Sequence, residues 1–579
     1  MKRWLPPLLL SLLLLGLTAC GGGGGSAGEE TAALPPLGPG ETAYDDPTAY
    51  SSAAGAALNG AVEGAAVTRH SLTLGSTRIA YTAHAGHLIA RHPVSGAAQA
   101  SVFYVAYLAE GANAATRPVT FFYNGGPGSA SVWLHLGSFG PKRLATGVPA
   151  TTAATPFALV DNSESLLDTS DLVFIDAVGT GLSQAITPFS NSSFWGVDAD
   201  AALFRDAIQR WQVLHGRSAS PLFLFGESYG GPRTAVLARR LQEAGVPLQG
   251  LVLQSPALDY NSNCGVIGAG GCSGYLPTYA AVGAWHQLTN PVPTDLGAYM
   301  TELRGFTAAQ YLPALQAGPP LRADLPPLLA ARTGFTAANW ARTDLFNLQP
   351  GSFQNLLFAN SIIGRYDGRM VATRGTPLAS EGDPSSTFIG ASFSSGMANH
   401  LRNTLRYSNR STYVLLGNAI NTWDFSHAGR TLPDTVPDLA AALAADPGLQ
   451  ILAANGYHDL ATPFYITELD LARLGVEPRV QVRNYAGGHM SYLDDGTRVL
   501  QKADLVAFYA QALASARVQP QRVTPVVRLA PPTVDRTGVV PTTPQPALAE
   551  PALQTPLRDP WVPPSASAAH IVRQRTDPP

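Results

Sequence analysis

Two kinds of segment alternate along residues 119–257. The first kind is a short run of mostly apolar residues, typical of a strand buried on both faces of a sheet. Such runs lie at Val119–Tyr123, Leu172–Asp176, Leu222–Phe225 and Gly250–Gln254. Segments with apolar residues at helical spacing lie between them. Strands that alternate with helices predict an open α/β sheet whose functional loops follow the carboxyl ends of the strands.

Two further groups of strands flank this region. Upstream, apolar and polar residues alternate in His70–Ala90 and Ala100–Leu108, which is the pattern of half-buried antiparallel strands. Downstream, apolar runs at Thr412–Leu416, Gln450–Ala454 and Arg479–Tyr485 indicate that the sheet resumes after an interruption. The predicted fold class is therefore α/β, with a mixed, mostly parallel central sheet.

Residues 258–411 interrupt the alternation of strands and helices. Helical pieces, many prolines and aromatic residues replace it there. We predict that 258–411 is an inserted, largely helical cap that covers the site at the strand ends, where substrate selectivity is commonly built. Residues 61–257 and 412–515 would then form one catalytic domain.

The N-terminal residues 1–19 have the pattern of a signal peptide. Two basic residues precede the apolar stretch Leu8–Leu17, which is too short to span a bilayer. The segment ends in Leu17-Thr18-Ala19-Cys20, which resembles the lipobox of bacterial lipoproteins. That resemblance implies lipidation of Cys20 and an exported protein of the cell envelope, anchored to the membrane. The alternative is an ordinary signal cut near Ala19, with the protein secreted or periplasmic.

Both ends of the chain have the composition of extended polypeptide. Residues 20–60, rich in Gly, Ala and Pro, predict a flexible tether, and the Pro-rich residues 516–579 predict a disordered tail. The chain of 579 residues is otherwise typical of a globular protein, with 45% hydrophobic residues. Only 13% of residues are charged and the net charge is −3, so no nucleic-acid partner is expected.

Cys264 and Cys272 lie near the start of the cap, eight positions apart, with glycines between them. In an exported protein such a pair is expected to form a disulfide. A metal site is the alternative, but nearby His or Asp ligands at suitable spacing are lacking. We expect neither a metal nor a cofactor.

The segment Gly226-Glu227-Ser228-Tyr229-Gly230 matches the Gly-x-Ser-x-Gly nucleophile elbow. A short apolar strand precedes it, and a helical pattern follows from Arg233 to Ala244. This setting matters, because the same five-residue pattern recurs at Gly24–Gly28, inside the predicted tether. In a strand–turn–helix setting Ser228 is held in a strained conformation, and the helix N-terminus directs N–H groups at negative charge that develops beside it.

A serine nucleophile needs a base to take its proton and an acid to orient that base. Asp459 and His489 each lie in a loop directly after one of the late strands. Together with Ser228 they follow the order Ser, Asp, His that is expected of α/β-hydrolases. His458 also follows a strand, but it adjoins Asp459 and cannot easily be oriented by it. The sequence therefore predicts the triad Ser228, Asp459 and His489.

Five motifs together resemble the serine carboxypeptidase family. They are Asn124-Gly-Gly-Pro-Gly-Ser-Ala-Ser131, Asp176-Ala-Val-Gly-Thr-Gly-Leu-Ser183, Gly226-Glu-Ser-Tyr-Gly-Gly231, Gly456-Tyr-His-Asp459 and Gly488-His-Met490. They occur in the order found in that family and span roughly residues 68–511. The chain departs from the family pattern at several positions, among them Tyr123, where the family commonly has Trp, and Ser129 and Ala130, which replace a Cys-Ser pairing. Gly456-Tyr-His-Asp459 replaces the more usual Gly-Asp-x-Asp, and Ser491-Tyr492-Leu493 replaces the Val-Pro that follows His-Met.

The resemblance implies roles for further residues. The backbone N–H groups of Gly126 and Tyr229 would form the oxyanion hole. Asn124, the backbone of Gly125 and Glu227 would hold the C-terminal carboxylate of a peptide substrate. The last role agrees with elementary electrostatics, because burial beside a second anion raises the pKa of a carboxyl group and lets it donate a proton to that anion.

The function that follows is a serine-type carboxypeptidase that acts on peptides through an acyl-enzyme and is favoured at acidic pH. An aminopeptidase, an esterase or an acyltransferase on the same fold is an alternative, because an ionised Glu227 could bind an ammonium group instead. A catalytically silent lipoprotein that only binds peptides is the alternative from another class.

Overall fold

The computed structural model describes residues 34–265 and 271–518. The lipidation site Cys20, the signal peptide at 1–19 and the tail beyond residue 518 lie outside the described residues. Residues 34–36 are the described part of a first unit that ends at Pro36, and they have no regular structure. The second unit begins at Leu37 and holds all the elements that follow.

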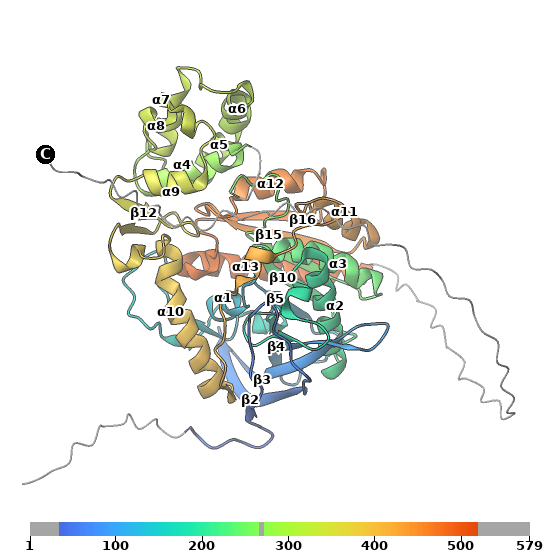
Figure 1. Cartoon of the computed structure of the whole chain (residues 1–579). Coiled ribbons are helices and arrows are strands. Elements are labelled where there is room, and N and C mark those ends of the chain that lie inside the picture. The colour runs from blue at the N-terminus through green and yellow to red at the C-terminus, as the bar shows by residue number, and fades with distance from the viewer. Residues whose placement is uncertain (1–33, 266–270, 519–579) are drawn as a thin grey trace, which may run out of the picture. The chain divides into compact units, whose positions relative to one another are not determined.

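A ten-stranded mixed sheet runs through this unit (Figure 1), which confirms the predicted fold class. Nine strands follow the order β16-β15-β11-β10-β5-β8-β4-β3-β2, and β9 pairs with β4. The strands are β2 (Gly64–Leu74), β3 (Thr77–Arg91), β4 (Ala98–Ala109), β5 (Val119–Tyr123), β8 (Asp171–Ile175), β9 (Gln184–Ala185), β10 (Leu222–Glu227), β11 (Gly250–Gln254), β15 (Gln450–Gly456) and β16 (Val480–Tyr485). From β8 to β16 neighbouring strands are parallel, whereas β2, β3, β4 and β9 pair antiparallel.

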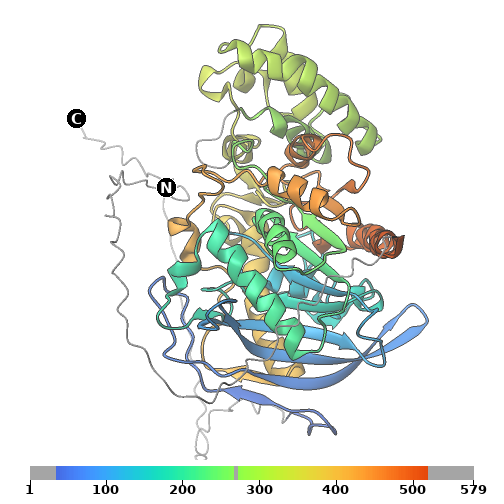
Figure 2. The same cartoon turned by 90° about the vertical axis from the view of Figure 1, so that its right-hand side faces the viewer.

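Helices cover both faces of the sheet, as the two perpendicular views show (Figures 1 and 2). On one face α2 (Val197–Leu214), α3 (Gly230–Glu243) and α11 (Val436–Ala445) bury residues such as Trp211 and Leu237 in a core cluster. On the other face α1 (Val132–Gly137), α10 (Pro384–Asn399) and α13 (Asp495–Val518) contribute residues such as Phe393 and Tyr509 to a second cluster. Every residue of β5 and β10 is buried, as expected of strands covered on both faces.

The insertion divides into two parts. Its first part contains the helices α4 (Leu276–Trp285), α5 (Leu296–Phe306), α6 (Leu312–Ala317), α7 (Leu325–Thr333), α8 (Ala337–Trp340) and α9 (Pro350–Leu356). These helices share a core of their own with Phe464 and Ile466 of α12 (Phe464–Ala472). The second part begins with the hairpin β12 (Ser361–Ile363) and β13 (Val371–Thr373). It continues with α10, which packs against the catalytic domain instead of the cap core.

Several boundaries differ from the sequence prediction. The stretch His70–Ala90 is two strands, because Gly75, with a φ of 58°, turns the chain between β2 and β3. Thr412–Leu416 is not a strand. This segment makes isolated β-bridges to two other loops, from Val414 to Gly181 and from Leu416 to Ser129. Leu416 is 63% exposed. An apolar run alone does not distinguish such a segment from a buried strand.

The prediction of a flexible tether at residues 20–60 is wrong for the later part of that range. β1 (Tyr44–Asp46) pairs with β14 (Tyr407–Asn409). Asp46 is buried and accepts hydrogen bonds from the hydroxyl groups of Tyr50 and Tyr407, both at 2.9 Å. Leu58 is also buried. The segment is held largely by polar contacts to distant residues, which neither composition nor periodicity reveals.

The remaining short strands β6 (Lys142–Leu144) and β7 (Leu159–Asp161) form a separate hairpin on the loop after α1.

Among the residues that the structure describes, none of the helices has the length and apolar character needed to cross a membrane.

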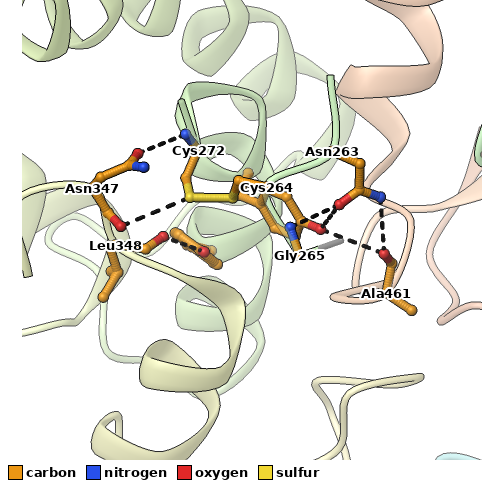
Figure 3. The surroundings of a disulfide bond; sticks show 9 residues. Asn263, Cys264, Gly265, Cys272, Asn347, Leu348 and Ala461 are labelled. Atoms are coloured by element: carbon orange, nitrogen blue, oxygen red, sulfur yellow. Dashed lines mark hydrogen bonds between the residues drawn. A yellow bond between two sulfur atoms is a disulfide. The ribbon is translucent and has the colours of Figure 1, made fainter. Parts of the chain in front are cut away.

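The predicted disulfide between Cys264 and Cys272 is confirmed (Figure 3). The backbone N–H of Cys272 donates to Oδ1 of Asn347 at 2.7 Å. Beside the bridge, Nδ2 of Asn263 donates to the carbonyl oxygen of Ala461 at 3.3 Å. Ala461 lies in the loop after β15, so the disulfide segment links the start of the cap to the catalytic domain.

We expect the double substitution Cys264→Ser and Cys272→Ser to lower the free energy of unfolding by roughly 2–3 kcal/mol, because it reopens a short closed loop in the unfolded chain. Denaturant unfolding of the purified protein measures this change. Wild-type protein under reducing conditions should match the variant. An unchanged unfolding midpoint in both would contradict a stabilising role for the bridge.

Candidate active site

The elbow joins β10 directly to α3 and places Ser228 at the carboxyl edge of the sheet. Ser228 has a φ of 62°, in the left-handed region that a non-glycine residue seldom adopts. Its backbone N–H donates to the carbonyl oxygen of Gln254, at the end of β11, at 2.9 Å. The turn needs glycine at Gly226, because a Cβ there would lie 2.2 Å from the carbonyl oxygen of Gly230. The helix α3 begins at Gly230, three residues before the predicted start at Arg233. Ser228 is partly exposed between two buried neighbours.

The structure brings Asp459 and His489 together. They follow the neighbouring parallel strands β15 and β16, and Nδ1 of His489 lies 2.7 Å from Oδ2 of Asp459. Both side chains are buried. Because Nδ1 faces the carboxylate, it carries the hydrogen, which leaves Nε2 as the basic nitrogen.

Further hydrogen bonds fix the acid. Oδ1 of Asp459 accepts the backbone N–H groups of Ala461 and Thr462, at 2.8 and 3.0 Å. The hydroxyl of Thr462 lies 2.8 Å from Oδ2 of Asp459, 3.0 Å from Nδ1 of His489 and 2.8 Å from the carbonyl oxygen of Ser255. Thr462 thus supports both side chains, and the sequence offered no motif that would have found it.

The backbone of His489 is fixed on both sides. Its N–H donates to the carbonyl oxygen of Tyr366 at 2.6 Å, and its carbonyl oxygen accepts the hydroxyl of Ser255 at 2.8 Å. Burial lowers the pKa of the imidazole, but the charge of Asp459 and the hydrogen bond to it raise this pKa more, so it lies above its ordinary value.

Within the described residues, no hydrogen bond joins Oγ of Ser228 to Nε2 of His489. In hydrolases without substrate this contact is often long or poorly aligned and tightens when substrate binds. His458, which the sequence analysis set aside, is buried and lies 3.3 Å through Nδ1 from the carbonyl oxygen of Gly487. Burial lowers its pKa to about 3.

The loop after β5 lies directly against the elbow. A Cβ at Gly125 would lie 2.4 Å from the backbone nitrogen of Tyr229, so only glycine allows this approach. Within the part of the chain that the structure describes, the N–H groups of Gly126 and Tyr229 donate to no acceptor. The two donors predicted for an oxyanion hole therefore lie on two segments whose backbones are in contact.

Glu227 and Asn124 form a buried pair. Nδ2 of Asn124 donates to Oε1 of Glu227 at 2.7 Å, and both residues are 3% exposed. Burial raises the pKa of Glu227 to about 7, against the opposing effects of His489 and of the hydrogen bonds from Tyr492 and Asn124. At neutral pH this carboxyl group is therefore neutral in a large fraction of molecules.

Tyr492 completes this group, and the sequence analysis assigned it no role. Its hydroxyl donates to Oε2 of Glu227 at 2.6 Å. The only signal in the sequence was that Ser491-Tyr492-Leu493 departs from the family pattern directly after the candidate base.

Arg233 lies beneath the elbow and is completely buried. Its Nε donates to Oδ2 of Asp200 on α2, and its Nη1 donates to the carbonyl oxygen of Asn124, both at 2.6 Å. The guanidinium also stacks over the ring of Phe204, 4.5 Å from the ring centre. Arg233 thereby joins the elbow helix to the loop that carries Asn124, Gly125 and Gly126.

Residues 75–267 match the family model described as serine carboxypeptidase. The matched segment contains the Asn124 loop and the elbow, whereas Asp459 and His489 lie beyond it. No curated protein matches the chain.

Several solved structures are similar to the chain at low identity. They include Kex1(Δ)p, a prohormone-processing carboxypeptidase from Saccharomyces cerevisiae, with 16% identity, 74% of this chain and 91% of that chain covered, and a TM-score of 0.48. A proline iminopeptidase from Mycobacterium smegmatis has 14% identity, 78% and 100% coverage and a TM-score of 0.30. A thermostable carboxyl esterase from Bacillus coagulans has 13% identity, 74% and 98% coverage and a TM-score of 0.32. At these scores the likenesses carry no functional argument.

Proposed function

We propose, from the match of residues 75–267 to the serine carboxypeptidase family model, that the protein is a serine-type carboxypeptidase that removes C-terminal residues from peptides. The coarser statement, that the chain is a serine hydrolase on an α/β-hydrolase fold, rests on the family match and on the sheet. One observation supports the more specific proposal of a carboxypeptidase. Glu227 directly precedes Ser228 in the elbow and forms a buried pair with Asn124 from the loop after β5.

The proposed reaction uses the triad in two steps. Oγ of Ser228 attacks the scissile carbonyl carbon while Nε2 of His489 takes the hydroxyl proton. The N–H groups of Gly126 and Tyr229 bind the oxyanion of the tetrahedral intermediate. His489 then gives the proton to the leaving amine, and the C–N bond breaks to leave an ester on Ser228. Water, deprotonated by His489, hydrolyses that ester.

The substrate carboxylate would be held by Glu227, Asn124 and the N–H of Gly125. A neutral Glu227 can donate its proton to a carboxylate, whereas an ionised Glu227 repels one. Because the pKa of Glu227 is about 7, the group is in its neutral, donating form on the acidic side of neutrality. This supports recognition of a free C-terminus at acidic pH.

The alternatives make different demands on the same residue. An aminopeptidase needs an ionised Glu227 to bind an ammonium group, and the raised pKa disfavours that form. An esterase or acyltransferase would use the triad without needing a free carboxylate. A silent peptide-binding lipoprotein would not need the bonds of 2.7 to 3.0 Å that hold Asp459 and His489 together.

We expect the wild-type protein to cleave N-terminally blocked peptides with a free C-terminus, and to act poorly on the same peptides as C-terminal amides. Ser228→Ala should lower kcat by about 10⁴-fold or more, because the triad loses its nucleophile. Mass spectrometry of the products measures both effects. Equal cleavage of the amide and the free acid would exclude a carboxypeptidase, and full activity of Ser228→Ala would exclude the triad mechanism.

We expect kcat/KM on free-acid peptides to fall as the pH rises through about 7, because Glu227 loses its proton there and repels the substrate carboxylate. Glu227→Gln has no proton to lose at this position, so its profile should lack that alkaline decline. The control is a C-terminal amide substrate, on which the two proteins should have the same profile above pH 7. An unchanged free-acid profile in Glu227→Gln would contradict the proposed role.

We further propose that the mature protein is exported and anchored to the membrane through a lipidated Cys20. Support comes from the basic and apolar pattern of residues 1–19 and from the lipobox-like sequence that precedes Cys20. Mass spectrometry of the mature N-terminus should show an acylated cysteine as its first residue. A free thiol, or cleavage before another residue, would contradict the anchor.

A further inference from the structure

Tyr492 lies on the far side of Glu227 from Asn124. We propose that Tyr492 is a positioning residue of the substrate-carboxylate site: its hydroxyl fixes the carboxyl group of Glu227 and bonds the oxygen that carries the proton offered to the substrate. The inference rests on the proposed function and deepens it, by adding to the site a residue that belongs to this chain's own departure from the family pattern.

Two donors hold the Glu227 carboxyl group from two sides. Tyr492 donates to Oε2 at 2.6 Å and Asn124 donates to Oε1 at 2.7 Å. Within the described residues these are the hydrogen bonds that the Glu227 side chain makes. Tyr492 is completely buried, and its ring belongs to the core cluster under α1, α10 and α13. Its carbonyl oxygen accepts Nη1 of the buried Arg498 at 3.1 Å, so the backbone is also held in place.

The hydrogen bonds decide which carboxyl oxygen carries the proton. Oδ1 of Asn124 accepts the backbone N–H of Leu134 at 3.0 Å, so the amide must direct its Nδ2 at Glu227. An amide nitrogen can only donate, and Oε1 of Glu227 therefore stays an acceptor. In the neutral acid the proton accordingly resides on Oε2, the oxygen that Tyr492 contacts. A hydroxyl suits this place, because it can donate to the ionised form or accept from the acid.

The charged and titratable groups around Glu227 come from several elements. His489 and Asp459 face it from the loops after β16 and β15, and Tyr366 interacts with it from the hairpin segment of the insertion. Burial, together with the neighbouring Glu227, raises the pKa of Tyr492 well above its ordinary value. Tyr492 therefore keeps its proton throughout the working range and stays a donor to ionised Glu227.

Removing the hydroxyl should change the titration of Glu227 in a known direction. A hydrogen bond to the carboxylate stabilises the ionised form and so lowers the pKa. In Tyr492→Phe the ionised form keeps only Asn124 as a donor, and the pKa of Glu227 rises above about 7. A residue that served only to fill the core would not change this titration.

We expect Tyr492→Phe to shift the alkaline decline of kcat/KM on free-acid peptides upward by roughly one pH unit. KM should rise while kcat changes less, because a less well positioned Glu227 weakens binding of the carboxylate. Replacing Tyr492 by 3-fluorotyrosine, whose hydroxyl is the stronger donor, should shift the decline to lower pH. This replacement keeps the ring and the hydrogen bond, and it serves as the test if Tyr492→Phe does not fold.

The matched control is Tyr407→Phe. It removes another buried tyrosine hydroxyl from another buried carboxylate, at the bond of 2.9 Å to Asp46. A comparable loss of stability without a shift of the pH profile is expected. If Tyr492→Phe and the fluorinated protein both keep the wild-type profile, or if Tyr407→Phe shifts it equally, the inference is wrong.

A second measurement separates this inference from the proposed function, because it needs no activity. The pKa of Glu227 is about 7 in the folded protein and about 4.5 in the unfolded chain. Protonated Glu227 therefore stabilises the folded protein below pH 4.5, and this stabilisation is lost as the pH rises through 7. The difference in stability between each protein and its Glu227→Gln derivative should follow this curve, and Tyr492→Phe should displace it to higher pH. If free acid and amide are cleaved alike but this displacement is seen, the proposed function fails and the coupling of Tyr492 to Glu227 stands. If Tyr492→Phe does not displace the curve, the coupling of Tyr492 to Glu227 is wrong, whichever substrate the protein cleaves.

Discussion

The buried guanidinium of Arg233 is the interaction on which the arrangement of the site depends. It joins the elbow helix α3, Asp200 on α2 and the carbonyl oxygen of Asn124 through bonds of 2.6 Å. Loss of one partner would leave an uncompensated charge in the core, at a cost of about 3–5 kcal/mol. Through this contact the segment with Asn124, Gly125 and Gly126 is held against the backbone of Tyr229. The N–H groups of Gly126 and Tyr229, which donate to no acceptor among the described residues, are the donors that we propose for the oxyanion.

The candidate site combines two buried carboxyl groups with different surroundings. Asp459 accepts hydrogen bonds from His489, Thr462 and two backbone N–H groups, an environment suited to an anion that orients a base. Among the described residues Glu227 has two donors in an equally buried position, and burial raises its pKa to about 7. Among the described residues, four donors therefore surround Asp459 and two surround Glu227, although both carboxyl groups are buried.

The candidate residues could be predicted because each is encoded locally. Ser228 follows the apolar run Leu222–Phe225 and precedes a helix. Asp459 and His489 each lie in a loop directly after a late strand, so the carboxyl edge of a parallel sheet had to gather these residues. The errors have a common physical cause. The segments at Tyr44–Asp46 and Thr412–Leu416 are placed by pairing with residues far away in the chain, which no local pattern records. Tyr492 was passed over for the same reason, since its partner Glu227 is 265 positions away.

By itself the sequence determined the class of fold, the disulfide and the identities of the candidate triad, since strand periodicity, cysteine spacing and motifs at strand ends are properties of short segments. Only the tertiary structure decided that Glu227 is buried between Asn124 and Tyr492, and that Thr462 supports both Asp459 and His489. Desolvation and hydrogen-bond geometry depend on everything that surrounds a group in space. The ionisation of Glu227, and with it the end of the peptide that we propose is held, is therefore a property of the packed molecule.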